Sequence, residues 1–298
     1  MAPMTVEQRD SEWSFGEAEE IAPGLLAQQL LGGGTRHEAY LSFDERLHHL
    51  VVVKVLRPHR VADDGAVRGL RGEAEVLASL NHPAIARLLR QAVDLDRPHI
   101  VLEFVEGPRL STLVRRFGPL DVEQAAALAV EVASALHYLH GMGVVHLDVK
   151  PKNLIMSAPP RLIDLSIART FASAADLDVP VGTDAYMAPE QCAPSPGRVG
   201  PAADVWGLGV TVYEALAGGP AFPGGSREGG AQLEERFPQL VHGPTPLPTH
   251  VAGEMKDAVE AALAFEPADR PSAVELADAV EPLLRRRRRF ALNRLKPR

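Results

Sequence analysis

Cysteine is nearly absent from this chain of 298 residues, and the single one is Cys192. One cysteine can form neither an intramolecular disulfide nor a cysteine-based zinc site, so the sequence excludes both. Such sparing use of cysteine fits a reducing compartment, and we expect the protein in the cytoplasm. Long apolar runs are also missing. No stretch approaches the length of a membrane span, and residues 1–10 have no signal-peptide core.

Basic residues are fewer than acidic ones, 31 against 39, which gives a formal net charge of −8. Residues 285–298 hold eight of the bases and no acid, so the remainder has 31 − 8 = 23 bases against 39 acids, or −16. An acidic body argues against nucleic acid as a specific partner. The basic tail, 285–298, is interpreted first as a solvated end. There are two alternatives. The tail could bind an anionic membrane surface, which would make the protein peripheral to the membrane, or it could bind an acidic partner.

Hydrophobic residues make up 46% of the chain and charged residues 23%, which is typical of a globular fold. Residues 1–20 are acidic and weakly patterned, and we predict a flexible segment there. The first half is predicted to be rich in strands, near residues 25–31, 50–56, 88–93 and 99–104, with one helix near 66–80. The second half is mainly helical, with helices near 121–141, from 203 onward, and near 251–265 and 272–284.

Three consecutive glycines, Gly32 to Gly34, follow the first of these strands. They let the backbone approach a ligand closely and can direct their amides at phosphate oxygens. The same residues also suit a flexible hairpin turn, and the sequence leaves both interpretations open.

A lysine, Lys54, lies inside the apolar run 50–56. It either extends to solvent from an edge strand or has a carboxylate or phosphate partner, because an unpaired buried ammonium is costly. Glu73 shares a helical stripe with Leu77 and Leu80, so it should face inward. We expect Glu73 to pair with Lys54.

A polar cluster, His-Leu-Asp-Val-Lys-Pro-Lys-Asn, occupies residues 146–153. Pro151 makes it a shaped loop, and apolar runs at 143–145 and 154–156 flank it. Polar residues held between short buried strands are commonly functional. A further short strand is predicted at 160–166 and includes Asp164.

Taken in order, these residues resemble the eukaryotic-type protein kinases, in particular the bacterial Ser/Thr kinases of that family. The resemblance covers roughly residues 25–284 and rests on six motifs in register. It implies an α+β bilobal fold with a β-rich N-lobe near 21–104, a hinge near 103–107 and a helical C-lobe near 108–284. The N-lobe would carry one regulatory helix. The implied activity is transfer of the γ-phosphoryl group of ATP to a Ser or Thr hydroxyl of a protein substrate.

The resemblance also implies an ATP site. Lys54, braced by Glu73, would hold the α- and β-phosphates. Residues 103–105 would be the hinge that meets adenine, with Leu102 at the back pocket and Ile155 chiefly a packing residue. The residues implied for ATP are Gly32, Gly33, Gly34, Ala39, Val52, Lys54, Glu73, Leu102, Glu103, Val105 and Ile155.

For the chemistry, Asp148 would orient the acceptor hydroxyl and accept its proton, and Lys150 would neutralise the moving phosphoryl group. Thr183 would bond to both. Asn153 and Asp164 would bind Mg²⁺, or Mn²⁺, because hard cations prefer oxygen ligands. Lysine at position 150 indicates Ser/Thr acceptors in this family.

Three further matches are architectural. Glu190 would form a buried bridge with Arg270, and Asp204 would hold the backbone of the 146–153 loop. Leu165 is a packing residue.

Several positions depart from the family pattern. His37 stands where the third glycine of the glycine loop usually lies, and Ala39 and Val52 replace the usual valine and alanine around the adenine. Leu165-Ser166 replaces the usual Phe-Gly after Asp164. Leu147 stands where most members have an arginine that grips a phosphorylated activation segment. Phosphorylation at Thr170 or Ser173 then has no obvious receptor, so we predict that activity does not depend on it.

The sequence leaves two other functions to consider beside this one. A pseudokinase that binds nucleotide or partner proteins is the main alternative, because the departures cluster at nucleotide and switch positions. A small-molecule kinase of the aminoglycoside type is disfavoured. Lys150, Thr183, Asp204 and the segment 188–190 form a protein-substrate platform that those enzymes lack.

Overall fold

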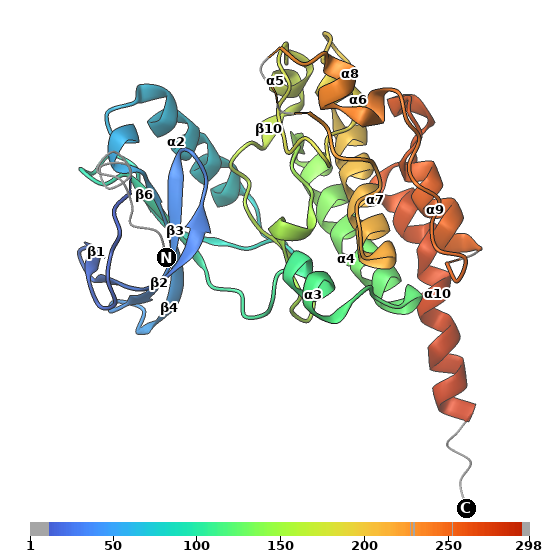
Figure 1. Cartoon of the computed structure of the whole chain (residues 1–298). Coiled ribbons are helices and arrows are strands. Elements are labelled where there is room, and N and C mark those ends of the chain that lie inside the picture. Colours follow the sequence, from blue (N-terminus) through green and yellow to red (C-terminus); the bar gives the residue numbers. More distant parts are fainter. Residues whose placement is uncertain (1–11, 227, 229, 252, 294–298) are drawn as a thin grey trace, which may run out of the picture. The chain divides into compact units, whose positions relative to one another are not determined.

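The computed structural model describes residues 12–226, 228, 230–251 and 253–293, with residues 285–293 described as backbone only. The chain divides into two compact units (Figure 1). The N-terminal unit comprises the residues up to Asn81 and Ala86–Glu106, and the C-terminal unit comprises His82–Ile85 and the residues from Gly107 onward. The division between Glu106 and Gly107 falls inside the range predicted for the hinge.

The N-terminal unit is built on a six-stranded antiparallel sheet in the order β1-β2-β3-β4-β6-β5. Its strands are β1 (Glu20–Ala22), β2 (Leu25–Gly33), β3 (His37–Asp44), β4 (His49–Leu56), β5 (Leu88–Ala92) and β6 (His99–Glu103). A short 3₁₀ turn, η1 (Pro58–Arg60), leads to helix α2 (Asp64–Ser79), which lies against β4, β5 and β6. Asp63 caps the helix by accepting bonds from the amides of Gly65 and Ala66.

Strand register gives the sheet two chemically different faces. Tyr40 lies opposite Val53, and both belong to a fully buried apolar cluster on one face. Ala39 lies opposite Lys54, and Val52 lies opposite Leu102, so these side chains point to the other face. Four residues predicted for nucleotide binding therefore share one face of the sheet, while the core occupies the other.

The prediction that residues 1–20 are flexible is wrong for residues 12–20, the part that the structure describes. Trp13 and Phe15 pack against the buried cluster of the sheet, and residues 20–22 form β1. The indole nitrogen of Trp13 donates to the carbonyl of Leu56 at 2.7 Å. An acidic stretch can be held this way because two aromatic rings supply the apolar contact area that its other residues lack. Residues 1–11 lie outside the described residues.

Helices dominate the C-terminal unit. They are α3 (Leu110–Phe117), α4 (Val122–Gly141), α5 (Phe171–Ala175), α6 (Pro189–Cys192), α7 (Pro201–Ala217), α8 (Leu233–Arg236), α9 (Glu254–Ala262) and α10 (Ala273–Asn293), with 3₁₀ turns η2 (Pro151–Asn153), η3 (Pro238–Leu240) and η4 (Pro267–Asp269). The helix α4 begins at the predicted cap, Asp121, which forms a reciprocal capping box with Gln124. The helix α7 is almost entirely buried and packs against α4 and α9.

Four two-residue strands shape the loops of this unit. They are β7 (Val144–Val145), β8 (Leu154–Ile155), β9 (Arg161–Leu162) and β10 (Arg169–Thr170), paired as β7 with β10 and β8 with β9. The strand predicted over 160–166 is thus wrong in length. It ends at Leu162 because Asp164 adopts a φ of +68°, which a strand cannot accommodate.

The last helix is longer than predicted. Its expected end was Leu284, but the backbone of α10 is helical to Asn293. The added residues are mostly arginine, a good helix former, and the next proline after Pro282 is Pro297. Residues 294–298 of the predicted tail lie outside the described residues. Across the described helices, none combines the length and apolarity that spanning a bilayer requires.

Candidate active site

A buried ion pair joins β4 to α2 in the N-terminal unit. Lys54 Nζ donates to both carboxylate oxygens of Glu73, at 2.6 and 2.8 Å. Both side chains are nearly inaccessible, 4% and 3% exposed. The bidentate contact explains how an ammonium is tolerated inside an apolar strand. The expected pairing is confirmed, and the alternative in which Lys54 extends to solvent is wrong.

The glycines form a turn of defined shape between β2 and β3. Gly32 has a φ of +135°, and a Cβ placed on Gly33 would lie 2.6 Å from the carbonyl oxygen of His37. The amide of Gly34 donates to that same oxygen at 3.0 Å. The first two glycines are therefore required by the turn itself. His37 begins β3 opposite Leu56.

The other residues predicted for ATP lie in both units. Glu103 ends β6, and its carboxylate pairs with Arg87 at 3.2 Å. Val105 follows this strand and is half-buried. Ile155 belongs to the C-terminal unit, where it lies in β8, is 8% exposed and bridges the backbone of Arg109. Its burial agrees with the packing role expected for it.

Three polar side chains, two from the 146–153 loop and one from outside it, converge on Asp148. Thr183 donates to Oδ1 of Asp148 at 2.7 Å, and Lys150 donates to Oδ2 at 2.6 Å. Lys150 also donates to Thr183 at 2.6 Å, which closes a triangle. Asn153 Nδ2 donates to Oδ2 and to the backbone oxygen of Asp148, at 3.1 and 3.0 Å. The carboxylate is thus held from both sides by residues that the sequence singled out.

The backbone of this loop is held by a buried carboxylate on α7. Asp204 accepts from the amides of His146 and Leu147, at 2.8 and 2.7 Å. His140 on α4 contacts the same carboxylate at 2.9 Å. Leu147 has a φ of +65°, an unusual conformation for a branched residue, and its side chain is 3% exposed. The predicted bracing by Asp204 is confirmed, while the contact of His140 was not predicted.

A second residue that the sequence did not predict joins the 146–153 loop to the activation segment, the part of the chain that contains Val181 and Thr183. Gln191 Nε2 donates to the carbonyl of Leu147 at 3.0 Å and to that of Val181 at 2.9 Å. It directly follows the Ala-Pro-Glu motif at 188–190, which is the one signal that could have drawn attention to it. The amide side chain ties the two segments together without any phosphate.

The two predicted phosphorylation positions lie at the start of α5 and are exposed. Thr170 caps this short helix by accepting from the amide of Ser173 at 3.3 Å. Arg169 Nη1 contacts the hydroxyl of Ser173 at 3.4 Å. The pairing of β10 with β7 and the bond from the amide of Phe171 to Gly143 dock this segment on the loop that precedes residue 146.

Oxygen donors suitable for a hard cation lie at the end of β9. The amide of Ile163 donates to the backbone oxygen of Asn153 at 2.9 Å, which brings the next residue, Asp164, alongside Asn153. Asn153 uses its amide nitrogen for Asp148, so its amide oxygen is the atom that would bind metal. Among the described residues there is no cluster of three or more His, Cys, Asp or Glu side chains that could hold a metal. Few protein ligands suit Mg²⁺, which usually keeps waters and substrate phosphates in its coordination shell, so the donor set fits.

Close to this cluster, Tyr186 is fixed as a neutral phenol. Its hydroxyl donates to Glu214 at 2.7 Å. Burial raises the pKa of Tyr186 well above its usual range, with the bond to Glu214 and the charge of Asp148 adding to the effect. Tyr186 therefore serves as a donor and does not become a phenolate near neutral pH.

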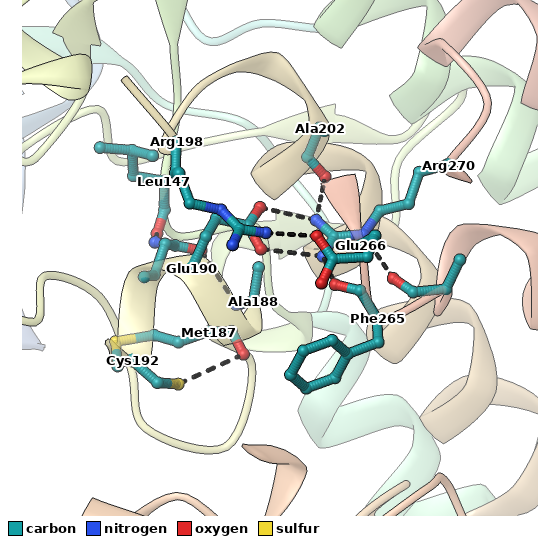
Figure 2. A network of polar contacts seen from close by, with 12 residues as sticks. Leu147, Met187, Ala188, Glu190, Cys192, Arg198, Ala202, Phe265, Glu266 and Arg270 are labelled. Atoms are coloured by element: carbon teal, nitrogen blue, oxygen red, sulfur yellow. Dashed lines mark hydrogen bonds and ion pairs between the residues drawn. The ribbon is translucent and has the colours of Figure 1, made fainter. Parts of the chain in front are cut away.

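A second buried ion pair lies deeper in the C-terminal unit (Figure 2). Arg270 donates to both oxygens of Glu190, at 2.6 and 2.8 Å, and the side chains are 0% and 1% exposed. It also donates to the carbonyls of Ala202, Ala264 and Phe265. All five donors of the guanidinium are engaged, and the predicted bridge is confirmed.

A β-rich unit with a buried Lys–Glu pair and a helical unit with an Asp-Lys-Asn loop define a protein kinase. The family model described as protein kinase domain matches residues 26–280, and the chain belongs to this family.

Similar proteins include serine/threonine-protein kinase PknB of Mycobacterium tuberculosis, 36% identical over 208 residues, which are 66% of this chain and 33% of the relative. PkaA of Streptomyces coelicolor is 36% identical over 234 residues, 76% of this chain and 42% of the relative. PknA of M. tuberculosis is 31% identical over 263 residues, 85% and 59% of the two chains. The chain spans about a third of the length of the PknB relatives it matches.

Proposed function

We propose that this chain transfers the γ-phosphoryl group of ATP to Ser or Thr hydroxyls of protein substrates. The observation that supports this most directly is the carboxylate of Asp148, held by Thr183, Lys150 and Asn153. Phosphoryl transfer needs alignment and charge stabilisation more than covalent chemistry, and this cluster provides both. The relatives PknB, PkaA and PknA are named as serine/threonine-protein kinases.

Each side chain of the cluster has one role. Asp148 accepts a hydrogen bond from the acceptor hydroxyl, orients it toward the phosphorus and takes its proton as transfer proceeds. Lys150 contributes positive charge where the transferred group gains negative charge. Thr183 bonds to both and so fixes the orientation of the two side chains, which also contact each other directly.

Nucleotide binding falls to the N-terminal unit. Lys54 holds the α- and β-phosphates, and Glu73 keeps its ammonium on the face of the sheet opposite the apolar cluster. Ala39, Val52 and Leu102, on that same face, contact the adenine. Mg²⁺, or Mn²⁺ with the same oxygen preference, bound by Asn153 and Asp164 would neutralise phosphate charge.

The activation segment is proposed to be ready for catalysis without phosphorylation. Leu147 is buried and cannot receive a phosphate, but its carbonyl is bonded by Gln191, which also holds Val181. Thr183 reaches Asp148 from the same segment. The contacts that a phosphate organises in relatives with arginine at this position are here made by neutral side chains.

Single-turnover transfer from labelled ATP to a generic acceptor or to the chain itself tests the activity. The Asp148→Asn variant keeps the size of the side chain and removes the base, so it is the matched control, and Lys54→Met tests the phosphate contact. Transfer should fall by about 10²-fold or more with Asp148→Asn. If ATP binds but wild type and control transfer equally, the chain is a nucleotide-binding scaffold and the kinase proposal is wrong.

The phosphorylation claim has its own test. Phosphatase-treated protein and a Thr170→Ala/Ser173→Ala variant should keep the turnover of the untreated wild type. Gln191→Leu should lower turnover instead, because it removes the two hydrogen bonds that join the 146–153 loop to the activation segment. Loss of turnover on phosphatase treatment would contradict the proposal.

The partners of the basic segment 285–298 and a cytoplasmic location stay predictions. Its eight bases suit a solvated end, an anionic membrane surface or an acidic partner. Sedimentation with anionic vesicles, with and without residues 285–298, distinguishes the membrane from the others. Equal sedimentation of both forms would remove the membrane interpretation.

A further inference from the structure

The described residues before β1 are connected to the glycine turn by one arginine, Arg57. We propose that Arg57 is a positioning residue that fixes the glycine turn and that residues 12–15 act as a latch completing its support. The latch thereby sets the affinity for the nucleotide. This inference rests on the proposed function only in taking the turn to contact nucleotide phosphates.

Arg57 follows directly after β4 and holds the turn at two carbonyls. Its Nε donates to the oxygen of Gly34 at 2.7 Å. Its own amide donates to the oxygen of Arg36 at 2.9 Å. The turn thus has its two outer carbonyls fixed from the side, in addition to the internal bond between Gly34 and His37. The side chain and the backbone amide of one residue thus both bond to the turn.

The same guanidinium meets a buried carboxylate next to the turn. Nη1 of Arg57 contacts Glu38 at 3.2 Å, and the side chains are 16% and 2% exposed. The other oxygen of Glu38 accepts from the hydroxyl of Tyr40 at 2.7 Å. Burial and this bond raise the pKa of Tyr40 above its usual range, so Tyr40 remains a donor. A charged carboxylate at this depth needs a cation, and Arg57 is well placed to supply it.

The N-terminal segment completes the arrangement. Glu12 contacts Nη1 of Arg57 at 3.1 Å, and the amide of Trp13 contacts Glu38 at 3.4 Å. Trp13 bonds to the carbonyl of Leu56, the residue before Arg57, and stacks on Phe15. The guanidinium of Arg97 lies 4.9 Å from the centre of the Trp13 ring. Glu12 thus contacts Arg57 itself, while Trp13 and Phe15 anchor the segment on the face of the sheet that bears the apolar core.

This arrangement compensates for a feature of the turn itself. His37 replaces the third glycine of the family pattern, and a Cβ at Gly33 would have no room. Both features restrict the backbone conformations that the turn can adopt. A guanidinium that binds Gly34 and Glu38 together selects one of these conformations. A lysine could keep the positive charge beside Glu38. It could not contact Gly34 and Glu38 through separate nitrogens as the guanidinium does, because its ammonium is a single point of contact.

The test uses the full chain and three variants: Arg57→Lys, Glu12→Gln and, as matched control, Arg71→Gln. Arg71 forms an exposed pair with Asp94 in the same unit and lies away from the turn in sequence. We expect Arg57→Lys to raise the dissociation constant and KM of Mg-ATP about tenfold, equivalent to about 1.4 kcal/mol. The kcat and the KM of the protein acceptor should change less than about twofold. Glu12→Gln should raise KM for ATP about threefold, and Arg71→Gln should change nothing.

Amide hydrogen exchange in nucleotide-free protein provides a second readout. Exchange at residues 34–37 should become faster in Arg57→Lys than in Arg71→Gln while the melting temperature stays within a few degrees. A purely structural ion pair would be rescued by lysine, so unchanged nucleotide affinity and unchanged exchange in Arg57→Lys would overturn the proposal. Failure of wild type to bind Mg-ATP would instead overturn the proposed function, and the exchange data would still decide the positioning role.

Discussion

Removing one partner of the Arg270–Glu190 pair should destabilise the C-terminal unit by about 3–5 kcal/mol, because it leaves a buried charge without its counterion. Glu190→Gln should lie near the lower end, since the amide oxygen can still accept one bond from the guanidinium. Arg270→Met should lie near the upper end. It strands a carboxylate that is 1% exposed and leaves the carbonyls of Ala202, Ala264 and Phe265 without this donor.

A convenient probe lies beside the pair. The guanidinium carbon of Arg270 lies 4.9 Å from the centre of the Trp206 ring. The chain has two tryptophans, so in a Trp13→Phe background the fluorescence of Trp206 reports on the C-terminal unit alone. For a unit of about 200 residues, 3–5 kcal/mol corresponds to a fall of roughly 6–20 °C in melting temperature.

A double-mutant cycle and a matched control make the reasoning refutable. The double variant Glu190→Gln/Arg270→Met should lose less than the sum of the single losses, by about 1–3 kcal/mol, because no charge is then left unpaired. The control is Arg198→Ala, which breaks the exposed pair with Glu266 drawn in the same view (Figure 2) and should cost less than about 1 kcal/mol. Single losses as small as that of the control, or strict additivity, would refute the argument.

Three other predictions follow from burial and packing. Burial lowers the pKa of His99, so its neutral form stabilises the fold above pH 6.5, the unfolded value, and that contribution is lost as pH falls below it. His99→Asn should therefore flatten the decline of melting temperature between pH 7 and pH 5, and an unchanged decline would show that His99 is not its source. The thiol of Cys192 is fully buried with a raised pKa, so a thiol reagent should modify it only upon unfolding, and prompt reaction in native protein would contradict this. A Cβ at Gly207 would lie 3.1 Å from both the Cβ and the carbonyl oxygen of Val149, so Gly207→Ala should displace the 146–153 loop and lower kcat several-fold in the transfer assay, whereas wild-type kcat would show that the loop can yield.

Local patterns predicted much of the architecture. The apolar run of β4, the stripe on α2 and the cap at Asp121 depend on neighbouring residues, so they could be recognised without a partner. Inward-facing Glu73 was predicted because helical periodicity places it beside Leu77. Element ends were less well predicted, as the early end of β9 and the late end of α10 illustrate.

Residues 12–15 could not be predicted to be ordered, since their contacts come from Leu56 and Arg97, more than 40 positions away. Arg57 lacked a signal for the same reason. It follows an apolar strand like many surface arginines, and only the folded sheet brings Gly34 and Glu38 within its reach.

The sequence by itself determined the family and the identity of the polar residues, because their types and order are properties of the chain. Tertiary structure alone decided which atoms meet. It placed Thr183 and Lys150 on one carboxylate and let neutral Gln191 bond the carbonyl of Leu147. Hydrogen bonds require distances near 3 Å between groups far apart in sequence, and only folding of the chain sets those distances.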